Sequence, residues 1–307
     1  MRKEFDLKKE TEKSILLRNR ISGEIQKETV FGDKVLRFFY ETLLGRGFWG
    51  LFFNSSCLSR LFGMYYDSGF SRKSIASLAA IDGCNAEEAA LPLNEYTSFN
   101  AFFTRKLKEG SRPFDADKEI LSSPSDGRIF VYENLRGNDP IPVKGAEKTL
   151  QELCCGLLPE NKSFAVAVVR LAPVDYHRYH FPCACEQKSA PVVIRGKYHS
   201  VNPVALKRRP DLFVENTRQI TILESAEFGR FYFLEVGAFG VGSIVQSSEP
   251  GRHEKLSEKG YFKFGGSTVI LIFEDEKLQW DADLLQSTSD AIESLVQCGM
   301  SIGKIKK

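Results

Sequence analysis

Several features that would place this chain in a familiar class are missing from its sequence. No uninterrupted apolar run of about 18 residues is present, so no transmembrane helix is predicted. The charged N-terminal residues 1–14 are not followed by the apolar core of a signal peptide. The net charge is only +2, so no whole-chain polycation argues for binding nucleic acid.

Disulfide and metal frameworks are missing as well. The seven cysteines are an odd number without the spacing of a disulfide framework, so we expect reduced thiols and a location on the cytosolic side. His177, His180, Cys183 and Cys185 could supply metal ligands, but their spacings match no common zinc pattern. No metal site is predicted.

Phenylalanine is abundant, with 24 copies against 3 Met and 2 Trp. Much of it lies in the first third of the chain, where residues 31–66 combine bulky apolar clusters with arginines. The spacing predicts two amphipathic helices. Such helices either pack on the protein core or lie in a membrane interface, with aromatic rings at the acyl boundary and arginines at the headgroups.

The order of the remaining patterns predicts the fold class. Residues 1–30 contain short strand-like runs, residues 67–95 favour short helices, and Ser98 is a candidate helix cap. From about residue 119, short β-like runs alternate with turns. We expect an α+β fold, with a helical region at 1–95 and a β-rich, sandwich- or barrel-like, mostly antiparallel domain at 96–307.

The stretch FGGSTVILIFE (264–274) places two glycines and Ser267 directly before an apolar strand. Taken alone, such a turn is usually a tight strand entry whose hydroxyls bond the local backbone. The glycines also let the backbone bend until the Ser267 hydroxyl approaches the carbonyl of Gly266. A serine-hydrolase elbow fits less well, because this stretch has no G-x-S-x-G.

Two other stretches could assist a reactive serine. The loop APVDYHRYHFPCAC (172–185) holds His177 and His180, two of only four histidines, and a histidine near a serine can act as general base. In SSPSDGRI (122–129), Asp126 either forms a turn into a strand or orients a histidine and stabilises its imidazolium form. Each histidine could also be a structural loop residue.

Four stretches in this order resemble the phosphatidylserine decarboxylase family, pyruvoyl-dependent enzymes that make phosphatidylethanolamine: FFTRKLKEGSRP, SPSDG, APVDYHRYHFP and GGST. The stretches VKGAEKTLQELCCG, KYHSVNPVAL, LFVENTR and VGAFGVGSIV agree with it. The resemblance covers residues 96–275 closely and the first 95 only by character. In two places the chain departs from the family, with Gly265 where leucine is usual and an altered order in FVENTR.

The resemblance implies self-processing. Ser267 attacks the Gly266 carbonyl, the resulting ester undergoes β-elimination, and the serine remnant becomes a covalent pyruvoyl group. The products are a large chain, 1–266, and a small chain, 267–307. The resemblance assigns activation of Ser267 to Asp126 with one loop histidine, His180 in preference, and proton handling in decarboxylation to His177. The sequence does not force this split, and the two histidines could be exchanged.

The resemblance also implies the reaction and its partners. The pyruvoyl group forms a Schiff base with phosphatidylserine, and CO₂ leaves to give phosphatidylethanolamine. A lipid substrate favours the membrane-interface interpretation of residues 31–66, with a peripheral location on the cytoplasmic side of the cell membrane. The two chains form a heterodimer, and a homodimer rests on family analogy alone. The alternatives are a pyruvoyl-dependent decarboxylase of a soluble amino acid and a processing-dead, lipid-binding homologue.

Overall fold

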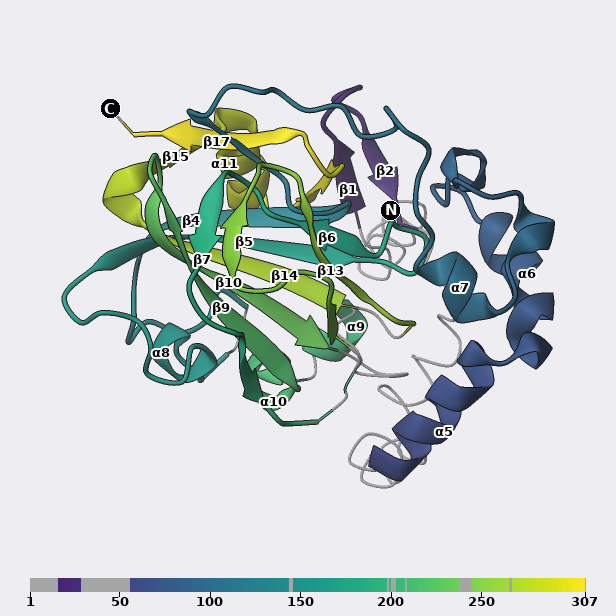
Figure 1. The fold of residues 1–307 in the computed structure, drawn as a ribbon. Coiled ribbons are helices and arrows are strands. Elements are labelled where there is room, and N and C mark those ends of the chain that lie inside the picture. Colours follow the sequence, from purple (N-terminus) through teal and green to yellow (C-terminus); the bar gives the residue numbers. More distant parts are fainter. Residues whose placement is uncertain are drawn as a thin grey trace, which may run out of the picture.

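The computed structural model describes residues 16–28, 56–143, 146–197, 199, 203–207, 209–237, 244–264 and 267–306. Two short strands come first, a helical segment follows, and a β-rich body takes up the rest of the described chain (Figure 1). The helical segment lies to one side of the central strands.

The strands are β1 (Leu16–Asn19), β2 (Ile25–Lys27), β3 (Ile120–Ser122), β4 (Gly127–Arg136), β5 (Ser163–Leu171), β6 (Arg178–His180), β7 (Cys185–Gln187), β8 (Val192–Ile194), β9 (Arg218–Ser225), β10 (Gly229–Gly237), β11 (Ile244–Gln246), β12 (Gly251–His253), β13 (Glu258–Phe262), β14 (Ser267–Glu274), β15 (Leu278–Trp280), β16 (Glu293–Val296) and β17 (Ser301–Ile305). The α-helices are α5 (Ser56–Asp67), α6 (Ile75–Ala79), α7 (Phe99–Phe103), α8 (Leu150–Leu153), α9 (Pro203–Leu206), α10 (Leu212–Glu215) and α11 (Ala282–Ser289). The 3₁₀ helices are η1 (Gly69–Ser74), η2 (Ala86–Glu88), η3 (Leu93–Glu95) and η4 (Asp275–Lys277).

Most strands belong to one 11-stranded sheet with the order β12-β7-β9-β10-β14-β5-β4-β16-β1-β2, and β8 pairs with β9. Its neighbours run antiparallel except β1 and β16, which are parallel. Two three-stranded antiparallel sheets, β11-β13-β6 and β15-β17-β3, accompany it. The predicted β-rich, mostly antiparallel body is confirmed.

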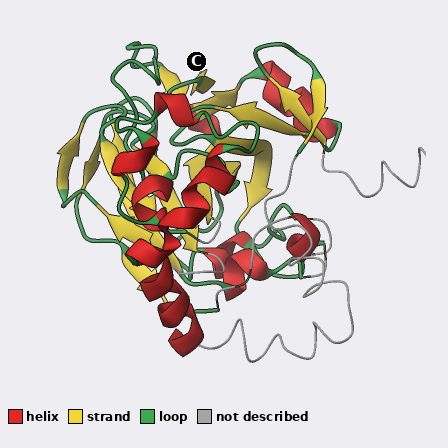
Figure 2. Cartoon of the chain, turned by 90° about the vertical axis from the view of Figure 1, so that its right-hand side faces the viewer, coloured by secondary structure: helices red, strands yellow, loops and turns green. Residues whose placement is uncertain are grey.

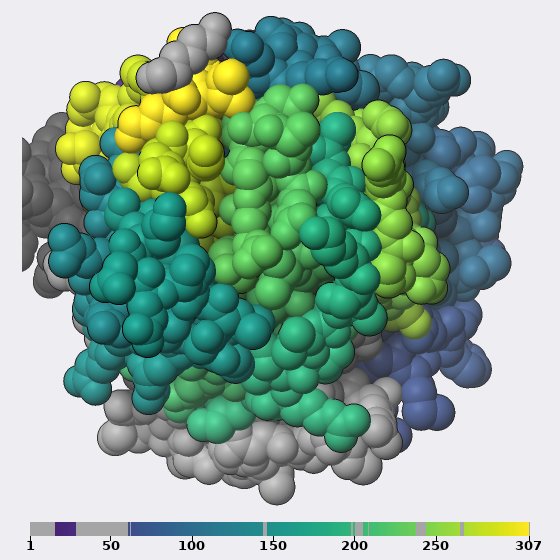
Figure 3. All heavy atoms as spheres, turned by 60° about the vertical axis from the view of Figure 1, so that its left-hand side comes forward, coloured from purple at the N-terminus to yellow at the C-terminus, as the bar shows by residue number. Residues whose placement is uncertain are grey.

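The centre of the large sheet is apolar on both faces. Along β14, Val269, Leu271 and Phe273 belong to one core cluster, and Ile270 and Ile272 belong to another. Alternate side chains of a strand point to opposite faces, so a run that is apolar throughout suits a strand covered on both sides. β14 lies between β10 and β5 (Figure 1). In the space-filling view the yellow C-terminal residues pack against the green and teal residues of the body (Figure 3).

The first residues also join the sheet. The sequence predicts short strands within residues 1–30, and β1 and β2 confirm them. β1 pairs with β16, so this segment shares a sheet with the β-rich body. The division into regions 1–95 and 96–307 stays a prediction.

The helical segment has its own apolar cluster. Ser98 caps α7 as predicted, because its Oγ accepts a hydrogen bond from the Ala101 amide at 3.1 Å. Aromatic side chains on α7 pack with Tyr66 of α5 and with Phe264. These helices lie together on one side of the sheet (Figure 2).

The two amphipathic helices predicted within 31–66 lie largely outside the described residues, and α5 occupies only the end of that range. No helix in the described ranges is long and apolar enough to span a membrane.

Candidate active site

Four neighbouring strands in the middle of the large sheet, β10, β14, β5 and β4, begin or end on the same side of the sheet, where their termini lie together. β5 ends at Leu171 and β10 ends at Gly237, while β14 begins at Ser267 and β4 begins at Gly127. Ser267 lies opposite both Leu171 and Gly237 in the antiparallel registers. Because β4 is antiparallel to β5, the start of β4 lies beside the end of β5. Asp126 and the loop that follows β5 therefore lie at the same end of the strands as Ser267.

The Ser267 hydroxyl is buried without a partner. The residue is 0% exposed, and no described residue hydrogen-bonds its Oγ atom. A buried, unsatisfied polar group costs about 1–3 kcal/mol. The hydroxyl therefore makes no bond to the backbone of the described residues, a state that it shares with the buried hydroxyls of Thr268 and Ser294. Gly265 and Gly266 lie outside the described residues.

His177 is held as a neutral imidazole. Its Nδ1 atom lies 3.0 Å from the carbonyl oxygen of Asp175. A carbonyl can only accept, so Nδ1 carries the proton and Nε2 keeps its lone pair. Nε2 is buried and has no described partner, and the ring lies against Phe103 with centroids 3.8 Å apart. Burial lowers the pKa of His177 to about 3.

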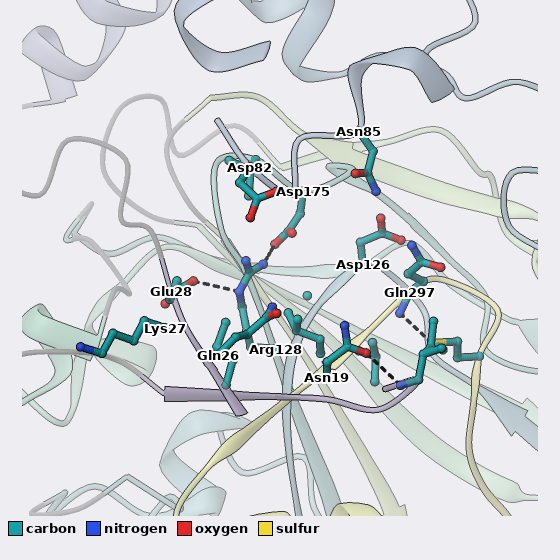
Figure 4. A pocket seen from close by; sticks show the side chains of 18 residues that line it. Asn19, Gln26, Lys27, Glu28, Asp82, Asn85, Asp126, Arg128, Asp175 and Gln297 are labelled. Atoms are coloured by element: carbon teal, nitrogen blue, oxygen red, sulfur yellow. Dashed lines mark hydrogen bonds and ion pairs between the residues drawn. The ribbon is translucent and has the colours of Figure 1, made fainter. Parts of the chain in front are cut away.

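An ion-pair network fixes the loop that carries His177. The Asp175 carboxylate accepts from the Ala172 amide at 2.6 Å and pairs with the Arg128 guanidinium. Arg128 also pairs with Glu28 at 2.8 Å. Figure 4 shows Arg128 between these two carboxylates at the wall of a cavity of about 350 Å³ that Asp126 also lines. The network ties the loop to β4 and to the segment after β2.

The Asp126 carboxylate is bonded on both oxygens. Arg112 donates through Nε to Oδ1 at 2.8 Å and through Nη2 to Oδ2 at 2.5 Å. The Cys298 amide also donates to Oδ1, at 2.9 Å. Arg112 reaches Glu88 at 2.8 Å as well, so one guanidinium holds two carboxylates. Asp126 is thereby fixed at the start of β4.

His180 lies on β6 beside a second cavity of about 410 Å³. Its amide donates to the carbonyl of Pro124 at 2.8 Å, and its Nδ1 lies 3.4 Å from the Cys298 Sγ. Burial lowers the pKa of His180, while the charges of Glu258 and Asp126 oppose that shift. His180 and Asp126 therefore lie on two sides of Cys298.

The four candidate residues are thus found near one end of the sheet, in two arrangements. Asp126 and His180 are linked through Cys298 and the 122–126 segment, without a hydrogen bond between their own side chains among the described contacts. His177 occupies a separate buried position next to Phe103, whose ring also contacts Phe264 just before the glycine pair. Both groups of residues lie at the end of the sheet where β14 begins.

Sequence reasoning missed Arg112 and Cys298. Arg112 lies within the quoted stretch FFTRKLKEGSRP, so its position in a family motif could have drawn attention to it. Cys298 carried no such signal, because a single cysteine beside a glycine is typical of many loops. Among the described residues, no group of three or more His, Cys, Asp and Glu side chains is arranged to hold a metal ion.

Comparison with known proteins gives a consistent result. A family model described as phosphatidylserine decarboxylase matches residues 99–304. The phosphatidylserine decarboxylase proenzyme of Clostridium novyi (strain NT) is 42% identical over 281 residues, which cover 90% of this chain and 94% of the relative. The proenzyme of Chlamydia muridarum (strain MoPn / Nigg) is 39% identical, over 93% of this chain and 96% of the relative.

Proposed function

Because the chain belongs to the phosphatidylserine decarboxylase family, we propose that it converts phosphatidylserine to phosphatidylethanolamine with an electrophile made from its own Ser267. The observation that carries this function is the buried, unpartnered hydroxyl at the first residue of a central strand. The similar proteins are named proenzymes, which fits a chain that is cleaved before it works.

Self-cleavage needs only the chain and one water. Ser267 Oγ attacks the Gly266 carbonyl carbon, the Ser267 nitrogen leaves as an amine, and an ester links the two residues. Loss of the Ser267 α-proton then breaks the bond between Cβ and Oγ, which frees the Gly266 carboxylate and leaves dehydroalanine. Water replaces the nitrogen, and ammonia departs. The two chains together weigh one water more and one ammonia less than the precursor.

The surroundings of Ser267 fit a pyruvoyl group. Gly237, directly opposite on β10, has no side chain to fill the face toward which Ser267 points, and Leu171 lies opposite on β5. When present, the group supplies a carbonyl that takes up the substrate amine and accepts electrons as CO₂ leaves. Hydrogen bonds from β14 to β10 and β5 hold residue 267 in place at the start of β14.

Asp126 and His180 are proposed to activate Ser267 for cleavage. His180 is the less enclosed of the two candidate histidines, and the Asp126 charge favours its protonated form. A base that takes the hydroxyl proton becomes positively charged, so a nearby fixed carboxylate stabilises it. Arg112 and the Cys298 amide keep that carboxylate in place.

His177 is proposed to handle the proton in decarboxylation. Its pKa of about 3 keeps it neutral, and its Nδ1–H bond to the Asp175 carbonyl leaves Nε2 as the only basic atom. After CO₂ leaves, the substrate carbon must receive a proton in a site closed to water. Nε2 first takes a proton from the substrate ammonium group, which must lose it before the amine can react, and then returns that proton to the substrate carbon.

The first experiment follows the chain by intact mass and denaturing gel. We expect the purified protein to appear as two fragments, the smaller one matching residues 267–307 with a blocked N-terminus. Ser267→Ala should remain one chain and should release no CO₂ from phosphatidylserine. A single intact chain that decarboxylates the lipid would overturn the proposal. Cleaved protein that acts on free serine instead would favour a soluble amino-acid substrate, and an uncleaved, inactive wild type would favour a lipid-binding homologue.

The second experiment separates the two histidines. His180→Gln should remain largely uncleaved, whereas His177→Gln should cleave and then decarboxylate at least about a hundredfold more slowly than wild type. His253→Gln is the matched control, because His253 contacts the Glu249 carbonyl and lies on β12, the outermost strand of the large sheet, four strands away from β14. The opposite pattern would exchange the two roles.

The protein is proposed to act at a membrane surface on the cytoplasmic side. Large apolar side chains are exposed on α5 and the turn that follows it: Leu61 (55%), Met64 (69%), Tyr65 (40%) and Phe70 (82%). Exposed apolar side chains gathered on one helical segment are typical of an interfacial contact. The cysteines in the described part of the chain are free thiols, in keeping with a reducing compartment.

Liposome sedimentation tests the membrane proposal. Replacement of Leu61, Met64 and Phe70 by Ser should weaken binding to phosphatidylserine vesicles, and replacement of Trp49, Phe52 and Phe53 by Ser tests the preceding segment. Val192 and Val193 are also exposed, at 45% and 57%, but lie on β8 in the body, so their replacement by Ser is the matched control. Undiminished binding by both sets of variants would remove the idea.

A further inference from the structure

The turn that carries Cys298 is fastened to the segment that carries Asp126. The Gly299 amide donates to the Ser123 carbonyl at 3.0 Å, and the Ser123 amide donates to the Met300 carbonyl at 2.7 Å. Gly299 has φ +92°, and a Cβ there would lie 2.7 Å from the Pro113 carbonyl oxygen, so the turn accepts only glycine. The position of the Cys298 side chain is therefore set by backbone contacts.

The thiol lies between a histidine and a carbonyl. Its Sγ is 3.4 Å from His180 Nδ1 and 3.7 Å from the Pro124 carbonyl oxygen. Burial raises the pKa of Cys298, and the neighbouring Asp126 charge adds to the effect, so the group is a neutral thiol. A neutral thiol offers one weak donor and one weak acceptor. Since a carbonyl can only accept, the proton of the thiol can go to Pro124 while the sulfur accepts from the imidazole.

We propose that Cys298 is a positioning residue for His180: its S–H group donates to the Pro124 carbonyl, its sulfur accepts from Nδ1–H, and the lone pair of the imidazole is kept on Nε2. This inference rests on the proposed function, in which His180 is the base for self-cleavage. The thiol takes the orienting place on the ring, while Asp126, held by Arg112, acts through its charge.

The contacts of Cys298 with His180 and Pro124 join residues on opposite sides of the proposed cleavage site. Cys298 belongs to the small chain, and His180 and Pro124 belong to the large chain, so the contact joins the two products. It exists in the uncleaved polypeptide, where the base must already be aligned. The contact also couples correct docking of the C-terminal strands to the chemistry at Ser267, because β16 and β17 flank the turn.

A crossed pair of substitutions tests the role. Cys298→Val fills the pocket but can neither donate nor accept, and Cys298→Ser can do both but fills it less well. A positioning role predicts that the Val variant cleaves itself about ten- to a hundredfold more slowly, while the Ser variant stays within a few fold of wild type. A packing role predicts the reverse order. If the Val variant does not fold, the same comparison is made between Cys298→Ala and Cys298→Ser.

The pH profile of self-cleavage gives an independent readout. In the proposed arrangement the imidazolium form loses an acceptor when the thiol is removed, so the acid limb of the Val variant should move to lower pH. The charges that face His180 are Glu258 on β13, Asp126 before β4 and Arg178 on β6, and all remain in the variant. A limb that moves to higher pH would mean that the thiol donates to Nδ1, which contradicts the proposal.

The outcomes separate this inference from the proposed function. A wild-type chain that never cleaves overturns the proposed function itself. A wild type that cleaves, together with a Val variant that cleaves equally fast with an unchanged pH profile, overturns only the role of Cys298. Self-cleavage is followed by denaturing gel after release from denaturant, with Ser267→Ala as the uncleaved reference.

Discussion

Ser267, the first residue of β14, lies directly opposite Gly237, the last residue of β10. The backbone of Gly237 is itself fixed, because its amide donates to the Thr217 carbonyl and its carbonyl accepts from the Asn216 side chain, each at 2.9 Å. On the β10 side, the residue that is proposed to react therefore faces a fixed main chain without a side chain, whereas on the β5 side it faces Leu171.

A side chain at position 237 should obstruct the chemistry. We expect Gly237→Val to slow self-cleavage by at least about tenfold, because directly opposite residues in an antiparallel pair have Cβ atoms only about 5 Å apart. Gly237→Ala should have a smaller effect. The fraction of uncleaved chain over time on a denaturing gel measures both, and circular dichroism checks the fold. Equal rates for the Val variant and wild type would show that the space is not needed.

The small chain should stay bound after cleavage. β14 lies between β10 and β5, both in the large chain, and β16 and β17 pair with β4 and β3. Several strands held on both sides resist separation because many buried hydrogen bonds must break together. Cleaved protein should elute from gel filtration as one species and separate only in denaturant. Loss of the small chain under native conditions would contradict this topology.

A buried ion pair joins the large sheet to the β11-β13-β6 sheet. Lys259 on β13 donates to Glu235 on β10 at 2.5 Å, and both side chains are 0% exposed. Removal of one partner leaves an uncompensated buried charge, which costs about 3–5 kcal/mol. Lys259→Met should therefore lower the free energy of unfolding by about that amount.

The double variant is the matched control for this pair. Glu235→Leu combined with Lys259→Met should recover most of the lost stability, since a buried pair replaced by apolar groups is often neutral. Urea denaturation in the Ser267→Ala background measures Lys259→Met, Glu235→Leu and the double variant without cleavage. Additive losses in the double variant would mean that packing, rather than charge pairing, is what the single change disturbs.

Structural features that depend on neighbouring residues could be predicted from the sequence, whereas contacts between residues far apart in the chain could not. The apolar run after Ser267 correctly predicted a strand, and the Ser98 cap was correct, because each depends on a few neighbouring residues. The partners of Asp126 could not be read in this way. Its carboxylate meets Cys298, which lies 172 positions away in the chain, and the pairing of β16 with β4 and of β17 with β3 brings them together.

The candidate site shows the same limit. The resemblance located Ser267, Asp126, His177 and His180, but it could not show that the two histidines have different environments. His177 is enclosed beside Phe103, and His180 borders a cavity. The difference arises because His177, in the loop before β6, and His180, at the end of β6, pack against different neighbours. These neighbours are set only when the chain folds.

Stability should fall in mild acid because the histidines are buried as neutral groups. Burial lowers the pKa of His177 to about 3, and it also lowers that of His199, to about 4. The unfolded chain binds a proton at each histidine near pH 6.5, whereas the folded chain does not. The contribution of the neutral histidines to stability is therefore present above pH 6.5 and is lost as pH falls toward the folded pKa.

For a fully buried histidine, the free energy of unfolding falls by about 1.4 kcal/mol for each pH unit below that range. Urea denaturation of Ser267→Ala between about pH 7.5 and 5 should show the decline, with a shallower slope in His177→Gln and a smaller change in His253→Gln, whose imidazole is only partly buried. A slope that His177→Gln leaves unaltered would mean that this imidazole takes up its proton in the folded state.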